Sequence, residues 1–210
     1  MAAARFGVES REGNMRLALA EAEKALAVQE VPIGCVIVRN CDGHVVARGR
    51  NNTVATGDAT RHAEFEAIDA ALAHADTGAI ASDLFDACTL YVTCEPCVMC
   101  AAALRYAGFR HVCFGCRNDK FGGCGSALSV HQAPTGGTSF QVEEGVFAEE
   151  AIALLRRFYA NENVNAPQAR KRQRNAPAAA GSESVDAEVE ASDVRACVSG
   201  GGSESQSAEG

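Results

Sequence analysis

Residues 89–107 read T-L-Y-V-T-C-E-P-C-V-M-C-A-A-A-L-R-Y-A, and the character of the sequence changes within this stretch. Its first part, 89–93, is rich in β-branched and aromatic residues and predicts a strand. Pro96 suits the first position of a helix, where a missing N–H costs nothing, and helix-favouring residues continue to about Ala107. The stretch therefore predicts a strand that leads into a helix, with cysteines at 94, 97 and 100 around the junction.

The segments on either side continue the alternation of strands and helices. Hydrophobic spacing predicts helices over 15–29, 62–75 and 148–159 and strands over 33–38, 44–49 and 111–115. An Asp-Gly turn at 42–43 predicts that the first two strands form a hairpin. Asp58 or Thr60 is the expected N-cap of the helix that begins at His62. Strands that alternate with helices after an opening hairpin predict an α/β fold, with a mixed sheet and helices on both faces.

The composition is that of a globular protein that does not enter a membrane. The 210 residues suffice for one domain with a sizeable core, and 47% hydrophobic and 22% charged residues are ordinary values. No run of ~18 apolar residues occurs, and the N-terminus lacks the apolar segment of a signal peptide. We therefore expect an intracellular protein, of the nucleus or the cytoplasm. Its ten cysteines are expected to be thiols or metal ligands rather than disulfides.

The charge is unevenly distributed and divides the chain. Residues 176–210 hold seven acids and one base, −6 of the total −8, which leaves −2 for residues 1–175. This Ser/Gly/Ala/Glu-rich segment lacks aromatic residues and predicts a disordered acidic tail. The segment before it, 166–175, carries a basic cluster: Arg170, Lys171, Arg172 and Arg174. The working domain is predicted over 13–165, after a flexible N-terminus at 1–12.

Two cysteines at the strand–helix junction are spaced to bind a metal ion. Cys97 and Cys100 are three residues apart at the predicted helix start, so their side chains lie on one helix face. The free N–H groups of a helix start favour thiolate over thiol, and thiolate is the form that zinc binds. Strand alternation places Cys94 with Leu90 and Val92 instead, so a packing role is expected for it.

Two thiolates leave a zinc ion short of ligands, and the chain offers two ways to complete the site. C-F-G-C at 113–116 would supply Cys113 and Cys116 and make a structural zinc ribbon, a binding module without catalytic activity. H-A-E at 62–64 opens another predicted helix and would supply His62, with Glu64 beside it. Three protein ligands would leave the fourth position for water, as in catalytic zinc sites.

H-x-E followed by P-C-x-x-C is the signature of zinc-dependent deaminases, and the chain resembles one family of them in further blocks. These blocks are E-V-P-I-G-C-V-I-V (30–38), G-R-N (49–51), A-T-R-H-A-E-F-E-A-I-D (59–69), Y-V-T-C-E-P-C-V-M-C-A-A-A-L (91–104), F-G-C-R-N-D-K-F-G-G-C-G-S (114–126) and F-Y-A-N-E-N-V-N-A-P (158–167). They resemble the catalytic subunits of eukaryotic tRNA adenosine deaminases and their bacterial relatives, over about residues 14–172. Cys94 departs from the valine expected in this family. The resemblance implies a cytidine-deaminase-like fold of three layers, α/β/α.

The resemblance also implies an activity and the residues that carry it. The reaction would be hydrolytic deamination of adenosine to inosine at the wobble position of tRNA anticodons, with one catalytic zinc held by His62, Cys97 and Cys100. Glu64 would act as general acid and base, and Asn51 would hydrogen-bond the flipped nucleoside. The family works as a heterodimer whose related second subunit lacks the glutamate. The presence of Glu64 therefore implies that this chain is the catalytic partner.

RNA contacts are expected in two places. Arg117, Asn118 and Phe121 match an anticodon-loop contact region of the family. The basic cluster at 170–174 is expected to contact tRNA phosphates, to act as a nuclear localisation signal, or both. A deaminase of free cytidine or deoxycytidylate shares the zinc motif and is the alternative enzyme, although the block at 158–167 and the basic cluster speak against it.

Overall fold

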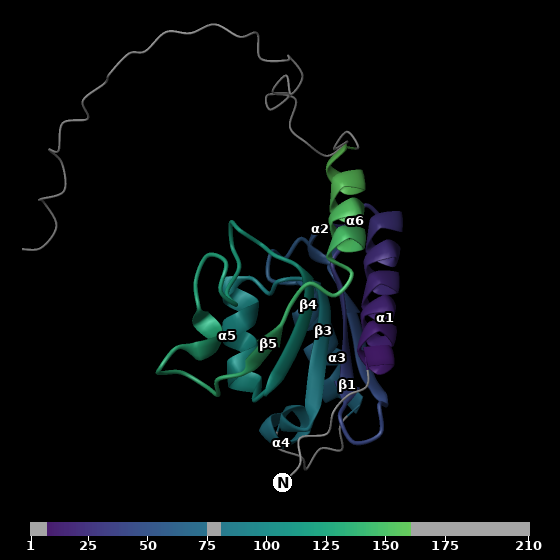
Figure 1. Ribbon diagram of the computed structural model, residues 1–210. Helices are drawn as coiled ribbons and strands as arrows, with labels where there is room; N and C mark the ends of the chain where they lie inside the picture. Colours follow the sequence, from purple (N-terminus) through teal and green to yellow (C-terminus); the bar gives the residue numbers. More distant parts are fainter. Residues whose placement is uncertain (1–7, 75–80, 161–210) are drawn as a thin grey trace, which may run out of the picture. The chain divides into compact units, whose positions relative to one another are not determined.

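Five strands form one mixed sheet in the order β2-β1-β3-β4-β5 (Figure 1). The structure is a computed structural model that describes residues 8–74 and 81–160. The hairpin strands β1 (Gly34–Arg39) and β2 (Val45–Arg50) are antiparallel, and β1 is also antiparallel to β3 (Cys88–Cys94). The strands β4 (His111–Cys116) and β5 (Gln141–Glu143) continue the sheet parallel to β3. The predicted mixed sheet with an opening hairpin is thereby confirmed.

Helices cover both faces of the sheet, which gives the three-layer α/β/α architecture (Figure 1). On one face, α1 (Val8–Ala27) and α6 (Ala148–Ala160) pack against the strands. The other face carries α3 (Ala63–His74), α4 (Ala81–Asp86) and α5 (Val98–Ala107). Within β1, Val36 and Val38 pack toward α1, whereas Cys35 and Ile37 pack toward α3. The period-two alternation of a strand therefore supplies two cores from one apolar run.

Two glycines in the hairpin let the helices lie directly against its backbone. A Cβ on Gly34 would stand 2.4 Å from the carbonyl oxygen of Ala18 in α1. A Cβ on Gly49 would stand 2.1 Å from the carbonyl oxygen of Ala63 in α3. Both contacts are too short for any side chain. Glycine at position 34 therefore lets α1 lie against β1, and glycine at position 49 lets the first turn of α3 lie against the end of β2.

The element boundaries differ from the predictions where local sequence is a weak guide. The helix α1 begins at Val8 rather than at residue 15, so it includes part of the predicted flexible N-terminus. The helix α5 begins at Val98, two residues later than predicted, because Cys97 is extended (φ −65°, ψ 169°) and occupies the cap position. Four short elements had no clear periodic signal: α2 (Thr53–Thr56), α4, the 3-10 helix Val130–Gln132 and β5.

The predicted basic segment and acidic tail, 166–210, lie outside the described residues. Within residues 8–74 and 81–160, none of the helices combines the length and the apolar character needed to span a membrane.

Candidate active site

The side chains of His62, Cys97 and Cys100 meet where two helices begin. His62 directly precedes Ala63, the first residue of α3, while Cys97 caps α5 and Cys100 lies in its first turn. The Nδ1 atom of His62 is 3.6 Å from the sulfur of Cys97 and 3.5 Å from the sulfur of Cys100. Cys97 and Cys100 lie 35 and 38 positions after His62 in the sequence. The fold thus brings all three side chains into one cluster of metal-binding atoms.

These distances fit a zinc ion. Zinc lies about 2.3 Å from sulfur and about 2.0–2.1 Å from nitrogen in tetrahedral sites, which separates a nitrogen and a sulfur ligand by about 3.5 Å. One imidazole and two thiolates are also a usual zinc ligand set. The two nitrogen–sulfur separations therefore match those of a tetrahedral zinc site, and the protein adds no fourth ligand atom among the described residues.

The two thiols share a proton in a way that favours metal binding. A hydrogen bond from Cys100, together with His62, lowers the pKa of Cys97 to about 4. The negative Cys97 sulfur and burial raise the pKa of Cys100 well above its usual value. A divalent cation bound at this position would neutralise the charge of both thiolates and would displace the remaining proton.

The zinc-ribbon alternative does not agree with this geometry. Cys113 is buried in the cluster that contains Met15 and Val36, on the sheet face covered by α1. Cys116 lies at the end of β4, paired in register with Cys94 of β3. Across residues 8–74 and 81–160, the one group of three metal-binding side chains with neighbouring donor atoms is His62, Cys97 and Cys100.

Cys94 is buried, as expected for a packing role, but the predicted face is wrong. It packs with Leu19 and Ala22 of α1, whereas Leu90 and Val92 belong to the core under α3 and α5. Cys94 is the last residue of β3, and the chain turns toward α5 directly after it. The alternation of side chains holds only within a regular strand, so it fails at this strand end.

Glu64 lies in the first turn of α3, next to the metal-binding cluster, and is only 4% exposed. Burial raises the pKa of Glu64 to about 7, and the charge of Cys97 acts in the same direction. A carboxyl group with a pKa near neutrality can both accept and donate a proton under physiological conditions. This protonation behaviour is the property that a general acid and base requires.

Asn51 occupies the N-terminus of α3 from a distant part of the chain. Its side-chain oxygen accepts a hydrogen bond of 3.0 Å from the backbone N–H of Ala63, and the residue is buried. The predicted caps are wrong, because Asp58 instead accepts hydrogen bonds from the backbone N–H and the hydroxyl of Thr60. A cap supplied through tertiary structure leaves no signature in the sequence next to the helix.

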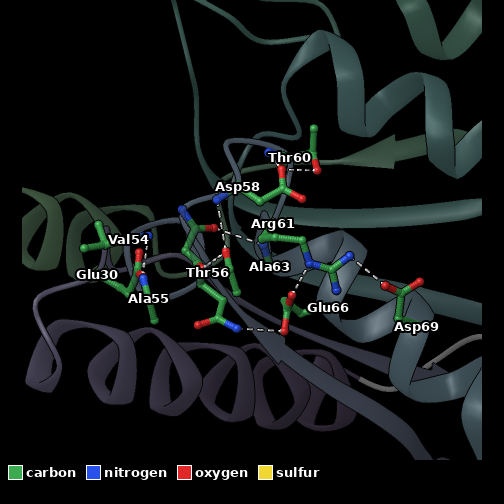
Figure 2. Close-up of polar contacts among 12 residues, drawn as sticks. Glu30, Val54, Ala55, Thr56, Asp58, Thr60, Arg61, Ala63, Glu66 and Asp69 are labelled. Atoms are coloured by element: carbon green, nitrogen blue, oxygen red, sulfur yellow. Dashed lines mark hydrogen bonds and ion pairs between the residues drawn. The ribbon is translucent and has the colours of Figure 1, made fainter.

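The loop that carries Asn51 is held from both sides (Figure 2). The buried carboxylate of Glu30 accepts hydrogen bonds from the N–H groups of Val54 and Ala55, at 2.6 and 2.9 Å. At the other end of the loop, Arg61 lies between the carboxylates of Glu66 and Asp69 of α3. Nothing in the sequence marks Glu30 as part of the site, since the sequence around a buried acid has no feature that distinguishes it from an exposed acid.

The candidate RNA contacts divide between a described loop and an undescribed segment. Arg117 forms an ion pair with Glu144, and Asn118 accepts a hydrogen bond from the backbone N–H of Phe121. Phe121 is 58% exposed. All three residues lie in the loop that follows β4, at the same end of the sheet as Cys97. The basic cluster lies outside the described residues.

Comparisons with known proteins agree with this geometry. The family model for the cytidine and deoxycytidylate deaminase zinc-binding region matches residues 8–116. The chain is 46% identical over 163 residues to tRNA-specific adenosine deaminase 2 of Xenopus tropicalis, an alignment that covers 76% of this chain and 95% of that protein. The chain belongs to the tRNA-specific adenosine deaminase family.

Two further relatives of the tRNA-specific adenosine deaminase family extend the similarity to bacteria and to solved structures. A tRNA-specific adenosine deaminase of Streptococcus pyogenes is 38% identical over 154 residues, 73% of this chain and 92% of that protein. A structure from studies of A-to-I editing by tRNA:A34 deaminases at the wobble position is 36% identical, with a TM-score of 0.62. That comparison covers 68% of this chain and 99% of the solved chain. The deaminase fold, the enzyme class and the zinc cofactor predicted from the sequence are thereby confirmed.

Proposed function

We propose that this chain converts adenosine to inosine at the wobble position of tRNA anticodons, as the catalytic subunit of a heterodimer. The observation that carries the proposal is the carboxyl group of Glu64, buried in the first turn of α3 beside a three-ligand metal site. A structural zinc site has four protein ligands and needs no acid next to it. Three ligands and a buried acid together favour hydrolytic chemistry.

The reaction consumes one water and releases one ammonia. His62, Cys97 and Cys100 would hold the zinc, which would supply Lewis-acid activation of a water. Glu64 takes a proton as the oxygen attacks C6 of adenine and passes it to the ring nitrogen N1. Glu64 then takes the proton of the new C6 hydroxyl and gives it to the amino group, which leaves as ammonia while the C6 oxygen becomes the carbonyl of inosine. Glu64 serves as general base when it takes a proton and as general acid when it gives the proton away. It ends the cycle in its starting protonation state.

The neighbouring residues orient the substrate. The side-chain oxygen of Asn51 is engaged by Ala63, which fixes the rotation of the amide and leaves its NH₂ group to donate to the nucleoside. A wobble base already lies in a single-stranded loop, so its entry into the site costs less than extraction from a duplex. Phe121, exposed in the loop after β4, offers an aromatic face for stacking with an anticodon-loop base.

The proposed partner is a related deaminase-like subunit that lacks the glutamate. Residues 1–175 carry 18 basic and 20 acidic side chains, a net charge of −2. A surface with this balance attracts a polyanion poorly, so a second subunit is expected to supply basic charge.

The test uses the chain purified alone and together with such a subunit. Each preparation is incubated with a tRNA that has adenosine at the wobble position and with a matched tRNA that has guanosine there, and the product is sequenced for inosine. The pair should form inosine at that position, and the chain alone should form little. Release of ammonia from free cytidine or deoxycytidylate, without action on tRNA, would support the alternative enzyme. Robust tRNA activity from a monomer or homodimer would contradict the heterodimer.

A further inference from the structure

Glu95 is a second buried acid near the metal-binding cluster, and the reaction described above does not use it. It lies between the end of β3 and Cys97, and it is 2% exposed. Among the described residues, no lysine, arginine or histidine forms an ion pair with it. A buried carboxylate without a cation needs hydrogen-bond donors to compensate for its lost hydration.

The loop after β4 provides these donors from its backbone. One carboxylate oxygen of Glu95 accepts a hydrogen bond of 3.0 Å from the N–H of Asn118. The other oxygen accepts from the N–H groups of Cys124 and Ser126, at 3.0 and 3.1 Å. One side chain therefore binds the loop near its beginning and again near its end.

The loop is shaped to close over this carboxylate. A Cβ added at Gly122 would lie 2.5 Å from the carboxyl carbon and oxygens of Glu95. A side chain at position 122 would therefore push the Glu95 carboxylate away from its hydrogen-bond donors. The N–H donors and Gly122 come from different parts of the loop. The hydrogen bonds and the close approach of Gly122 are therefore two separate observations that place the Glu95 carboxylate at the centre of the loop.

The same loop pairs with the backbone on both sides of a metal ligand. The N–H of Val98 donates to the carbonyl of Phe121 at 2.9 Å, and the N–H of Gly123 donates to the carbonyl of Pro96 at 2.8 Å. Cys97 lies between Pro96 and Val98. Any shift of the loop relative to Glu95 therefore changes where Phe121 stands relative to the metal-binding cluster.

We propose that Glu95 is a positioning residue for nucleic-acid binding: it fixes the 118–126 loop so that Asn118 and Phe121 meet the anticodon loop while the target base enters the zinc site. The tRNA part of this inference rests on the proposed function. Among the described residues, the hydrogen bonds of the Glu95 carboxylate go to the loop backbone and none goes to Glu64 or a metal ligand, so it is expected to act on binding rather than on the chemical step. The expected signature is a change in KM for tRNA with little change in kcat.

Glu95→Gln tests the inference with almost no change in volume. A glutamine places an NH₂ donor against at least one backbone N–H in either amide orientation, so a buried donor loses its acceptor. In the heterodimer, KM for tRNA should rise by roughly tenfold, with kcat changed less than about threefold and zinc content unchanged. Amide exchange at Asn118, Cys124 and Ser126 should become faster than in the wild type.

Arg105→Met is the matched control. Arg105 is also buried and also holds a loop, since it donates to the carbonyl oxygens of Ala133, Thr135 and Gly137. That loop carries none of the predicted RNA contacts. The control should lose stability, as Glu95→Gln does, but it should leave KM for tRNA near the wild-type value.

Two further variants separate a positioning role from a general loss of structure. In Gly122→Ala the added methyl group clashes with the Glu95 carboxylate from the loop side, so KM for tRNA should rise as in Glu95→Gln. This variant leaves Glu95 unchanged, so it tests the inference even if Glu95→Gln folds poorly. Phe121→Ala combined with Glu95→Gln should give less than the sum of the two single effects, because one acts through the other.

Three results would overturn the inference: equal KM values for Glu95→Gln and Arg105→Met, fully additive effects with Phe121→Ala, or unchanged amide exchange in the loop. A wild-type heterodimer that leaves wobble adenosine unmodified would instead contradict the proposed function. The exchange measurement needs no tRNA, so it still reports whether Glu95 holds the loop.

Discussion

The side-chain oxygen of Asn51 accepts a hydrogen bond from the backbone N–H of Ala63, the residue between His62 and Glu64. One buried amide at the end of β2 thereby fixes the position of the H-A-E segment. The hydrogen bond with Ala63 uses only the oxygen of this amide and does not involve its NH₂ group. Asn51 can therefore hold the metal-binding and proton-transfer residues in place and bind the substrate with its other half.

Replacement of Asn51 by aspartate should separate these two roles. Aspartate keeps an oxygen for the N–H of Ala63, and a negative charge at a helix N-terminus is favourable, so stability should change little. Asn51→Ala removes the cap and should cost about 1 kcal/mol. Deamination should fall strongly in both variants because the NH₂ donor is lost. Denaturant unfolding and single-turnover deamination measure the two effects, and full activity in Asn51→Asp would exclude the donor role.

Zinc content should depend on three side chains. His62→Ala and Cys97→Ser should each reduce bound zinc from about one ion per chain to nearly none, since two ligands do not hold zinc in a catalytic site. Cys113→Ser is the matched control: a buried cysteine on the far face of the sheet, whose loss should leave zinc in place. Metal analysis after gel filtration measures this. Loss of zinc in Cys113→Ser would restore the ribbon alternative.

Glu64→Gln should separate zinc binding from chemistry. The carboxylate is not a ligand, so zinc content and tRNA affinity should match the wild type. The amide cannot transfer the proton, so the deamination rate should fall by about 10²–10⁴. Zinc analysis, tRNA binding and single-turnover rates on one preparation test this. A variant that lost its zinc would contradict the role assigned to Glu64.

Glu30→Ala should loosen the loop that carries Asn51. The carboxylate accepts hydrogen bonds from Val54 and Ala55, so its removal leaves buried donors unpaired, at a cost of about 1–3 kcal/mol. Asp42→Ala is the control, since Asp42 also accepts from a backbone N–H but is exposed, so water can replace it and the change should stay within about 0.5 kcal/mol. Urea unfolding compares the two, and equal losses would contradict the anchoring role of Glu30.

The basic cluster should bind tRNA without regard to its sequence. Replacement of Arg170, Lys171, Arg172 and Arg174 by alanine should weaken binding of cognate and non-cognate tRNA alike. If all four contact phosphates, the dependence of log K on log salt should flatten by roughly 3, at ~0.7–0.9 for each contact. Thermal stability should not change. An unaltered salt slope, with a changed distribution in cells, would assign the cluster to localisation alone.

The sequence by itself determined the parts of the site that depend on local structure. H-A-E at 62–64 and P-C-V-M-C at 96–100 stand at helix starts because strand-to-helix transitions, proline and residue spacing act over a few residues. The same short-range patterns gave the hairpin, the mixed sheet and the helices on both faces. Boundaries were less accurate: α1 starts seven residues before its prediction, because residues 8–14 lack the hydrophobic spacing on which the prediction depended.

Only the tertiary structure decided which groups meet. Asn51 replaces the local caps that the sequence offered, Cys94 packs under α1 and α6 rather than with Leu90, and the acids Glu30 and Glu95 become anchors for two loops. No local pattern marks these roles, because burial and hydrogen-bond geometry depend on residues far apart in the chain. A carboxylate needs a partner only after folding removes its water, and the packing of the whole domain determines where that happens.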